Sequence, residues 1–261
     1  AKFCDEAELG LQSESIKSVS APSILIAGCG TGQHSIGVAS RFTDCHVTAV
    51  DLSRASLAYA QRETSELGIT NVDYLHADIL ELDQLEQRFD LIECAGVLHH
   101  MDEPMAGWRV LVNLLRVGGL MKIGLYSELA RRHVKRVRGE IAQQGIGASG
   151  GEIRQFRQSV IESHCEHHKQ LTRNFDFFSL STVRDLIFHA QEHCFSLPQI
   201  ENCLDDLGLG FCGFESRETR TKFKAVFGDE ANVYDLSLWD KFEETHPHTF
   251  ASMYQFWCQK L

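Results

Sequence analysis

The residues best suited to chemistry in this 261-residue chain begin with three glycines on alternate positions, Gly28, Gly30 and Gly32. They follow the apolar run 24–27 and precede a helix-like pattern. The segment therefore predicts a buried strand, a tight turn and a helix N-terminus. Glycine has no Cβ, so such a turn can adopt positive φ and lets a ligand approach the main chain closely. The chemistry that this pattern predicts is nucleotide binding against bare backbone.

The spacing of the glycines separates two classes of nucleotide-binding protein. The dinucleotide fingerprint G-x-G-x-x-G would need glycine at position 33, where Gln33 stands. A nicotinamide-dependent oxidoreductase is therefore disfavoured. The observed G-x-G-x-G spacing is a weak signal alone, because glycine-rich turns between strand and helix are common. Its weight depends on the residues that follow at later strand ends.

Side chains that could move protons follow two later apolar segments. His99 and His100 come after the segment 89–94, and Tyr126 ends the segment 120–126. Histidine titrates near neutral pH, so either histidine could act as a general base, and Tyr126 is a further candidate for the pocket. The alternative is that the histidines only line or cap a loop.

Two more histidines, His189 and His193, have the H-x-x-E-H spacing of inverted zinc proteases. That chemistry needs a third ligand and a long supporting helix. The segment 196–198, Ser-Leu-Pro, breaks the chain soon afterwards. We therefore expect no metal here. We expect the two side chains either to point into a substrate pocket or to form a solvated or core pair.

One dense basic run stands out, and its members are Arg131, Arg132, Lys135, Arg136 and Arg138. It could hold an acidic substrate or a phosphate group, and it is the one feature that favours RNA. A solvated helix surface is the simpler interpretation. The histidine-rich segment 164–168 is likewise expected on a solvated face. The formal net charge of −11 argues against a nucleic-acid partner.

Alternating strands and helices are needed to position these residues. Apolar periodicity predicts six strands, at 24–27, 47–51, 71–77, 89–94, 120–126 and 209–215. Helices are predicted at 32–41, 53–67, 103–115, 219–227 and 236–244. Residues 253–258 fit either a final antiparallel strand or a helix. The fold class predicted is α/β, a doubly wound, mostly parallel, seven-stranded Rossmann-like sheet that binds its ligand beyond the carboxyl ends of the strands.

A helical insertion is predicted after strand five. Apolar residues recur with helical spacing on both sides of a glycine-rich loop at 145–151. A further helix is predicted from Thr182, with Asp185 completing a capping box, and the core pattern resumes with Ser196 as an N-cap. The predicted organisation is an N-terminal segment 1–20, a core formed by 21–126 and 196–261, and a helical cap of residues 127–195.

Composition narrows the protein class further. Apolar residues make up 43% and charged residues 23%, as in ordinary globular proteins. No run approaches the about 18 apolar residues of a membrane helix, so no membrane partner is expected. Nine cysteines without a C-x-x-C pair favour free thiols in a reducing compartment, and we expect the cytoplasm. The start at Ala1 fits a piece of a longer multidomain chain as well as a removed methionine.

Residues 21–127 and 197–215 together resemble the class I S-adenosylmethionine-dependent methyltransferases. The resemblance rests on the glycine turn, on Ala-Val-Asp-Leu-Ser at 49–53, on His-Ala-Asp-Ile at 76–79 and on the segment 89–100. It implies that Asp51, 23 positions after Gly28, accepts hydrogen bonds from the ribose hydroxyls. It implies further that Asp78 accepts a hydrogen bond from the adenine amino group of the cofactor and that Ile79 packs on the adenine ring. The main chain near Cys94 would face the methionine end of the cofactor.

Each implied role has a simpler structural alternative. Asp51 could be a helix N-cap, and Asp78 could be an ordinary turn aspartate. The predicted cofactor-binding residues are Gly28, Cys29, Gly30, Gly32, Asp51, Leu52, Asp78, Ile79 and Cys94. The candidate catalytic residues are His99, His100, Tyr126, His189 and His193.

The activity implied by the resemblance is methyl transfer from S-adenosyl-L-methionine to a small molecule, by in-line displacement under the helical cap, with S-adenosyl-L-homocysteine as product. Two alternatives stay open. This family usually carries a carboxylate at the end of the first strand, where Ala27 stands here, so the chain could be a catalytically silent binding module. The methyl acceptor could also be a protein or an RNA.

Overall fold

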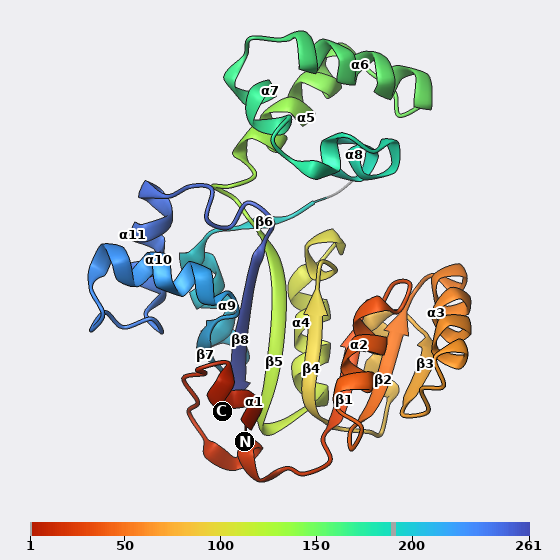
Figure 1. Ribbon diagram of the computed structural model, residues 1–261, viewed down its shortest axis with the longest axis vertical. Coiled ribbons are helices and arrows are strands. Elements are labelled where there is room, and N and C mark those ends of the chain that lie inside the picture. The colour runs from red at the N-terminus through yellow and green to blue at the C-terminus, as the bar shows by residue number, and fades with distance from the viewer. Residues whose placement is uncertain (1, 189–191) are drawn as a thin grey trace.

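The computed structural model describes residues 2–188 and 192–261. Its centre is a sheet whose strands follow the order β3-β2-β1-β4-β5-β8-β7 (Figure 1). The strands are β1 (Ser23–Ala27), β2 (His46–Asp51), β3 (Val72–His76), β4 (Phe89–Ala95), β5 (Leu115–Ser127), β7 (Leu209–Phe214) and β8 (Tyr254–Lys260). The first five are parallel to one another, and β8 runs antiparallel to β5 and β7. The predicted doubly wound, mostly parallel α/β fold is confirmed.

The order of the strands reverses beside β1, which pairs with β2 on one edge and with β4 on the other. A crevice opens beyond the strand ends at such a reversal, and it is where open α/β sheets bind ligands. The undecided C-terminal segment is the strand β8. It lies between β5 and β7 and is buried over most of its length, so its residues do not alternate between apolar and polar.

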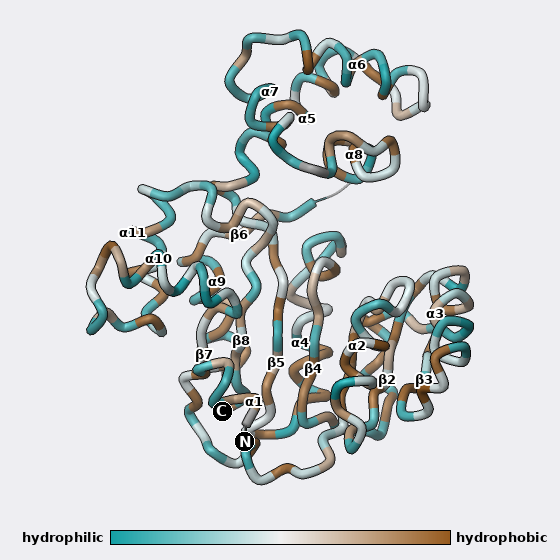
Figure 2. Tube along the Cα trace, in the orientation of Figure 1, coloured by the Kyte–Doolittle hydropathy of each residue, from teal (hydrophilic) through white to brown (hydrophobic). Residues whose placement is uncertain are grey.

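Helices cover the two faces of the sheet. On one face lie α2 (Gln33–Arg41) and α3 (Arg54–Glu66), which pack on β2 and β3. On the other, α4 (Pro104–Leu114) and α9 (Leu197–Leu207) help to enclose the main apolar core, which α10 (Arg217–Phe227) and α11 (Leu236–Thr245) extend. Hydrophobic residues are accordingly concentrated along the strands (Figure 2).

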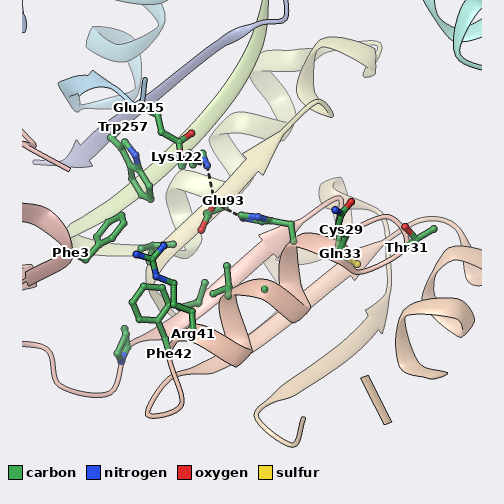
Figure 3. Close-up of a pocket in the computed structure, with 16 residues that line it drawn as sticks. Phe3, Cys29, Thr31, Gln33, Arg41, Phe42, Glu93, Lys122, Glu215 and Trp257 are labelled. Carbon is green, nitrogen blue, oxygen red and sulfur yellow. Dashed lines mark hydrogen bonds and ion pairs between the residues drawn. The ribbon is translucent and has the colours of Figure 1, made fainter. Parts of the chain in front are cut away.

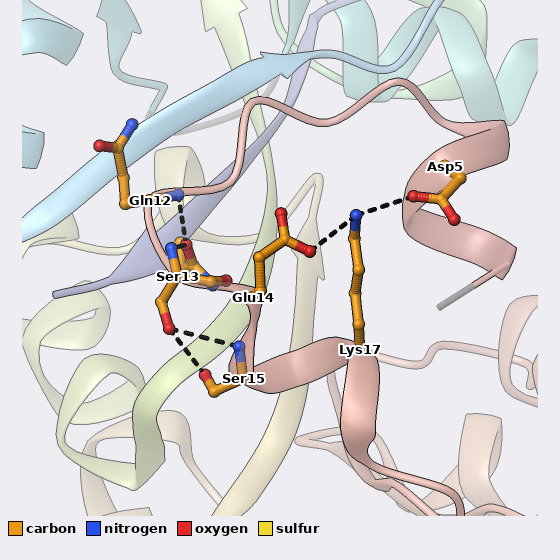
Figure 4. Close-up of polar contacts among 7 residues, drawn as sticks. Asp5, Gln12, Ser13, Glu14, Ser15 and Lys17 are labelled. Carbon is orange, nitrogen blue, oxygen red and sulfur yellow. Dashed lines mark hydrogen bonds and ion pairs between the residues drawn. The ribbon is translucent and has the colours of Figure 1, made fainter.

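The N-terminal segment is fastened to the last strand. It contains α1 (Lys2–Glu6) and a 3-10 turn, η1 (Glu14–Ser18). The main-chain N–H groups of Gln12 and Ser13 donate to Oε1 of Gln259 in β8, at 2.7 and 2.9 Å. Lys17 bridges Asp5 and Glu14 at 2.9 and 2.8 Å, which ties α1 to η1 (Figure 4).

The predicted cap is a helical unit with its own apolar core. It comprises α5 (Arg132–Gln144), α6 (Gly150–Glu162), α7 (Glu166–Leu171), η4 (Phe175–Phe177) and α8 (Leu180–Ile187). Residues such as Val137, Ile153 and Val183 bury their side chains within it. The cap lies beyond the carboxyl ends of the strands (Figure 1). The chain enters it from β5 and returns through β6 (Cys194–Phe195), which pairs with Tyr126 and Ser127.

Two details of the cap differ from the prediction. Helix α8 begins at Leu180 with Ser179 as its N-cap, so the capping box expected at Thr182 is wrong. The hydroxyl of Thr182 instead donates to the main-chain oxygen of Asp176, at 2.7 Å. The glycine-rich loop is shorter than expected, because α6 takes in its last two glycines. The capping box formed by Ser149 and Glu152 starts that helix early.

The nine cysteines are all free in the structure, and most are buried. Within residues 2–188 and 192–261, none of the helices is both long and apolar enough to cross a membrane.

Candidate active site

The glycine turn after β1 has the geometry of a ligand cradle. Gly28, Gly30 and Gly32 all have positive φ, at 82°, 54° and 86°. A Cβ built on Gly28 would lie 2.1 Å from Cγ2 of Val97, whereas one on Gly30 would meet no described atom within 4 Å. Gly30 therefore faces open space that a ligand can enter. Among the described residues no side chain caps the start of α2 at Gly32, which leaves main-chain N–H groups for an anionic ligand group.

Asp51 holds the glycine turn from the end of β2. Its Oδ2 accepts from the N–H of Gly30 at 2.7 Å, and its Oδ1 accepts from the N–H of Ser53 at 2.8 Å. The alternative that Asp51 caps a helix is wrong, because Ser53 is the N-cap of α3. Each carboxylate oxygen has a further lone pair for a hydroxyl group. Leu52, beside it, is 67% exposed and presents an apolar surface next to the carboxylate.

Asp78 and Ile79 follow β3 on the same side of the sheet. Asp78 is the N-cap of η2 (Ile79–Gln84), with its Oδ1 accepting from the N–H of Leu80 at 2.9 Å. The turn role offered as the alternative for Asp78 is thus present, and it occupies one carboxylate oxygen. The side chain of Ile79 is largely buried in the main core, so only its edge is available to a ligand.

The two cysteines of the predicted site have buried thiols. Burial raises the pKa of both Cys29 and Cys94 to about 12, and the charge of Asp51 adds to the effect at Cys29. Both thiols therefore stay protonated at neutral pH. A ligand at these positions would therefore contact the main chain and not the thiols, as expected for Cys94.

Three of the candidate catalytic side chains meet where β4 and β5 end. The ring of His99, in η3 (Leu98–His100), stacks on Tyr126 at 3.7 Å between centroids. His100 meets the same ring edge-on at 5.7 Å. The guanidinium carbon of Arg131 lies 3.7 Å from the centre of the Tyr126 ring. Since His99 and Arg131 both lie 3.7 Å from the centre of the Tyr126 ring, they must occupy its opposite faces, and the ring is held between them.

A buried ion pair fixes this arrangement to the base of the cap. Nε and Nη2 of Arg131 donate to the two carboxylate oxygens of Glu192, both at 2.8 Å, and the side chains are 6% and 4% exposed. Arg138 adds a contact to Glu192 at 3.1 Å. The expectation of a solvated basic run is therefore wrong for Arg131, the buried residue that immediately precedes α5. The main-chain N–H of His193 donates to the carbonyl of His99 at 2.8 Å. His189 lies outside the described residues.

A cavity of about 660 Å³ lies between the cap and the core, beside this cluster. Tyr126 and Met253 are on its wall, together with cap residues from α5, α7 and η4. Sδ of Met253 lies 2.8 Å from the position of a Cβ on Gly124, and its Cε lies 3.9 Å from that of a Cβ on Gly96. Met253 therefore lies between the cavity and the ends of β4 and β5, next to the predicted position of the cofactor's methionine end.

A larger cavity, of about 810 Å³, lies elsewhere, on the α2 face of the sheet (Figure 3). Its polar wall is a charge network in which Nε2 of His34 donates to Glu93 at 2.7 Å and Lys122 contacts Glu215 at 2.7 Å. Glu93 raises the pKa of His34. Of the predicted site residues described, Cys29 alone is on its wall. This cavity lies beside the strands, and Asp51 and Asp78 lie beyond their ends, so the two places are distinct.

Within the described part of the chain, no group of three or more histidine, cysteine, aspartate or glutamate side chains could hold a metal ion. The histidines of 164–168 are partly structural and not simply solvated. Nδ1 of His167 lies 2.9 Å from Nδ1 of His133, and Nε2 of His168 pairs with Glu140 at 2.7 Å. These contacts fasten α7 to α5.

Comparison with known proteins identifies the family. Residues 24–119 match the model of a methyltransferase domain family. This match covers the glycine turn, Asp51, Asp78 and the segment through η3. Residues 24–119 therefore form a domain of the class I S-adenosylmethionine-dependent methyltransferases. S-adenosyl-L-methionine is the cofactor of this family, as the resemblance implied.

Longer relatives of this chain extend the comparison. An uncharacterised protein of Synechococcus sp. is 30% identical over 85% of this chain and 56% of its own length. A ubiquinone biosynthesis O-methyltransferase of Marinobacter nauticus is 33% identical over 55% of this chain and 61% of its own. PKMT2 from Rickettsia typhi, solved in complex with AdoHcy, superposes with a TM-score of 0.74 at 16% identity. It covers 97% of this chain and 51% of its own, so it supports the fold, cap included. The chain spans little more than half the length of these relatives.

Several residues of this candidate site escaped the sequence analysis. Met253 belongs to the C-terminal segment whose secondary structure was undecided. Glu192 is the glutamate of the H-x-x-E-H motif, and its conspicuous spacing was a usable signal, although its partner is an arginine. Val97, which closes on Gly28, carries no signal in the sequence.

Proposed function

We propose that this chain transfers a methyl group from S-adenosylmethionine to a small-molecule acceptor bound between the strand ends and the cap. The observation that carries the proposal is the cavity lined by Tyr126 and by Met253, whose side chain packs toward Gly96 and Gly124 at the strand ends. It is a concave site of the volume expected for a small organic ligand.

The residues at the strand ends suit the cofactor. The N–H groups at the start of α2 would hold a carboxylate, and the free lone pairs of Asp51 would accept from ribose hydroxyls. The second oxygen of Asp78 would accept from the adenine amino group. Gly30 leaves room for the ligand because it has no side chain. When bound, S-adenosylmethionine supplies a methyl group that its sulfonium activates for in-line displacement.

The chain's own contribution to the reaction is then alignment and exclusion of water. Burial raises the pKa of Tyr126, so its hydroxyl stays protonated at neutral pH and orients the acceptor instead of removing a proton from it. His99 is fully buried and positions the Tyr126 ring. His193 holds the His99 main chain. The half-buried His100 is left as the candidate general base for acceptors that lose a proton.

Transfer of a radiolabelled methyl group tests this proposal. The protein and tritium-methyl S-adenosylmethionine would be incubated with an extract separated by size into small molecules, proteins and RNA. We expect label in the small-molecule fraction and none with Asp51→Ala. Label confined to the protein or RNA fraction would contradict the small-molecule acceptor. An absence of label everywhere, with cofactor binding intact, would favour the silent binding module.

A further inference from the structure

The cavity between cap and core has two chemically different ends. Its apolar wall includes Tyr126, Ala251 and Met253, which lie toward the ends of β4 and β5. Its polar wall comes mainly from the cap, with His133 of α5 and the turn after α7, and from His248 of the core. A ligand that fills both ends needs an apolar body and a polar group at a distance from the reacting atom.

Three imidazoles gather at the polar end. Nδ1 of His133 and Nδ1 of His167 are 2.9 Å apart, so one of them must donate to the other. Nε2 of His133 accepts from the guanidinium of Arg132 at 3.4 Å, which places the proton of His133 on Nδ1. The ring of His248 stacks on His133 at 6.2 Å. The cluster joins α5 and α7 of the cap to the core.

Arg132 places a positive charge beside His133 at this end. Burial lowers the pKa of His133 first, and the neighbouring Arg132, His167 and His248 lower it further. The opposing carboxylate, Glu166, is fully exposed and engaged with the Nε2 group of Gln170 at 2.7 Å. It lies outside the cavity wall. An anion in the cavity would therefore be attracted to this end, where the stacked ring of His248 can supply the N–H that His133, engaged at both ring nitrogens, cannot.

Arg173 adds a charge that is available to a ligand. It is on the cavity wall and exposed, and its Nη1 donates to the neutral amide oxygen of Gln170 at 3.2 Å. Arg131 is different, because Glu192 neutralises it. The one carboxylate on the wall, Asp176, acts at the other end, where its charge contributes to the raised pKa of Tyr126.

We propose that the acceptor is a small organic acid whose carboxylate is bound by Arg173 and His248, while its apolar body lies along Tyr126 and Met253. The proposal rests on the proposed function, since it assigns the acceptor class of the same cavity. A guanidinium presents the fork of donors that a carboxylate accepts, and imidazolium adds a charged donor.

Binding of benzoate, with benzamide as the neutral match, tests the carboxylate directly. Both would be titrated by calorimetry into protein saturated with AdoHcy and into protein without it, at about pH 6.5 in two buffers of different ionisation enthalpy. We expect saturable benzoate binding with proton uptake, and benzamide binding at least about tenfold weaker, the ratio that a charge-assisted hydrogen bond gives. Equal binding of the two probes, or no benzoate binding, would overturn the proposal.

Variants locate the site and separate the two proposals. Arg173→Gln and His248→Asn should each weaken benzoate about tenfold or more and leave AdoHcy affinity unchanged. Lys169→Gln removes a charge from α7 outside the cavity wall and should change neither. Benzoate affinity unaltered in Arg173→Gln, or inorganic phosphate competing as well as benzoate, would refute the carboxylate site. If the wild-type protein does not bind AdoHcy, the methyltransferase proposal is refuted instead. Benzoate binding measured without cofactor would still test the carboxylate site in the cavity.

Discussion

Replacing Gly30 with alanine should weaken cofactor binding and leave the fold nearly intact. Its φ of 54° is left-handed, so a Cβ there costs about 1–2 kcal/mol of folding free energy. The added methyl group meets no described atom within 4 Å, so it adds no clash within the protein. It enters the space assigned to the cofactor instead. Overpacking by one methyl group costs about 1–3 kcal/mol, so AdoHcy should bind about tenfold to a hundredfold more weakly.

Gly32→Ala is the matched control for Gly30→Ala. Its φ is 86°, and its Cβ would lie 2.6 Å from the Cβ of Ala60 and 3.1 Å from the hydroxyl of Tyr74. The clash is inside the fold, so the free energy of unfolding should fall by about 2–5 kcal/mol, the sum of strain and overpacking. Urea denaturation and calorimetric titration with AdoHcy measure the two effects separately. Wild-type AdoHcy affinity in Gly30→Ala would refute the assignment of the open side of the turn to the cofactor.

Three further predictions concern the side chains around the site. Glu192→Gln leaves the buried Arg131 without its carboxylate, so urea denaturation should show a loss of about 3–5 kcal/mol, and a loss below about 1 kcal/mol would contradict the buried pair. Tyr126→Phe keeps the ring in place and should lower the free energy of unfolding by less than about 1 kcal/mol without moving the pH profile of methyl transfer, whereas a moved profile would assign the hydroxyl a proton-transfer role. The ion pair of His34 with Glu93 should stabilise the fold fully at pH values below the imidazole's pKa in the unfolded chain, about 6.5. That stabilisation should be lost as the pH rises through the higher pKa of His34 in the folded protein. Thermal denaturation at about pH 6 and about pH 8 should show this loss in the wild type and not in His34→Gln.

The sheet could be predicted from the sequence because its parallel strands are short apolar runs separated by helical periodicity. The same argument failed at 254–260, where burial of β8 on both faces removes the alternation that distinguishes a strand. Asp51 was also predictable, because its distance along the chain from Gly28 fits one strand–helix–strand unit. The structure adds that it bonds to Gly30 itself.

The part of the site that lies at the junction of the cap with β5 and β6 could not be predicted, because it depends on contacts between distant segments. Arg131 and Glu192 are 61 residues apart and meet only because β5 and β6 pair where the chain enters and leaves the cap. Charge density along the chain therefore gave a wrong environment for Arg131. The pairing of His133 with His167 likewise depends on how α5 packs on α7, which no local pattern specifies.

Calorimetric titration with AdoHcy tests the central claim most directly, with NAD as the comparison ligand and Asp51→Ala as the variant. Asp51 supports the turn at Gly30 and is assigned to the ribose, so the claim predicts micromolar binding of AdoHcy, its loss in a folded Asp51→Ala protein, and no heat with NAD. Binding of NAD, or AdoHcy affinity unchanged in Asp51→Ala, would contradict the assignment of the strand ends to S-adenosylmethionine.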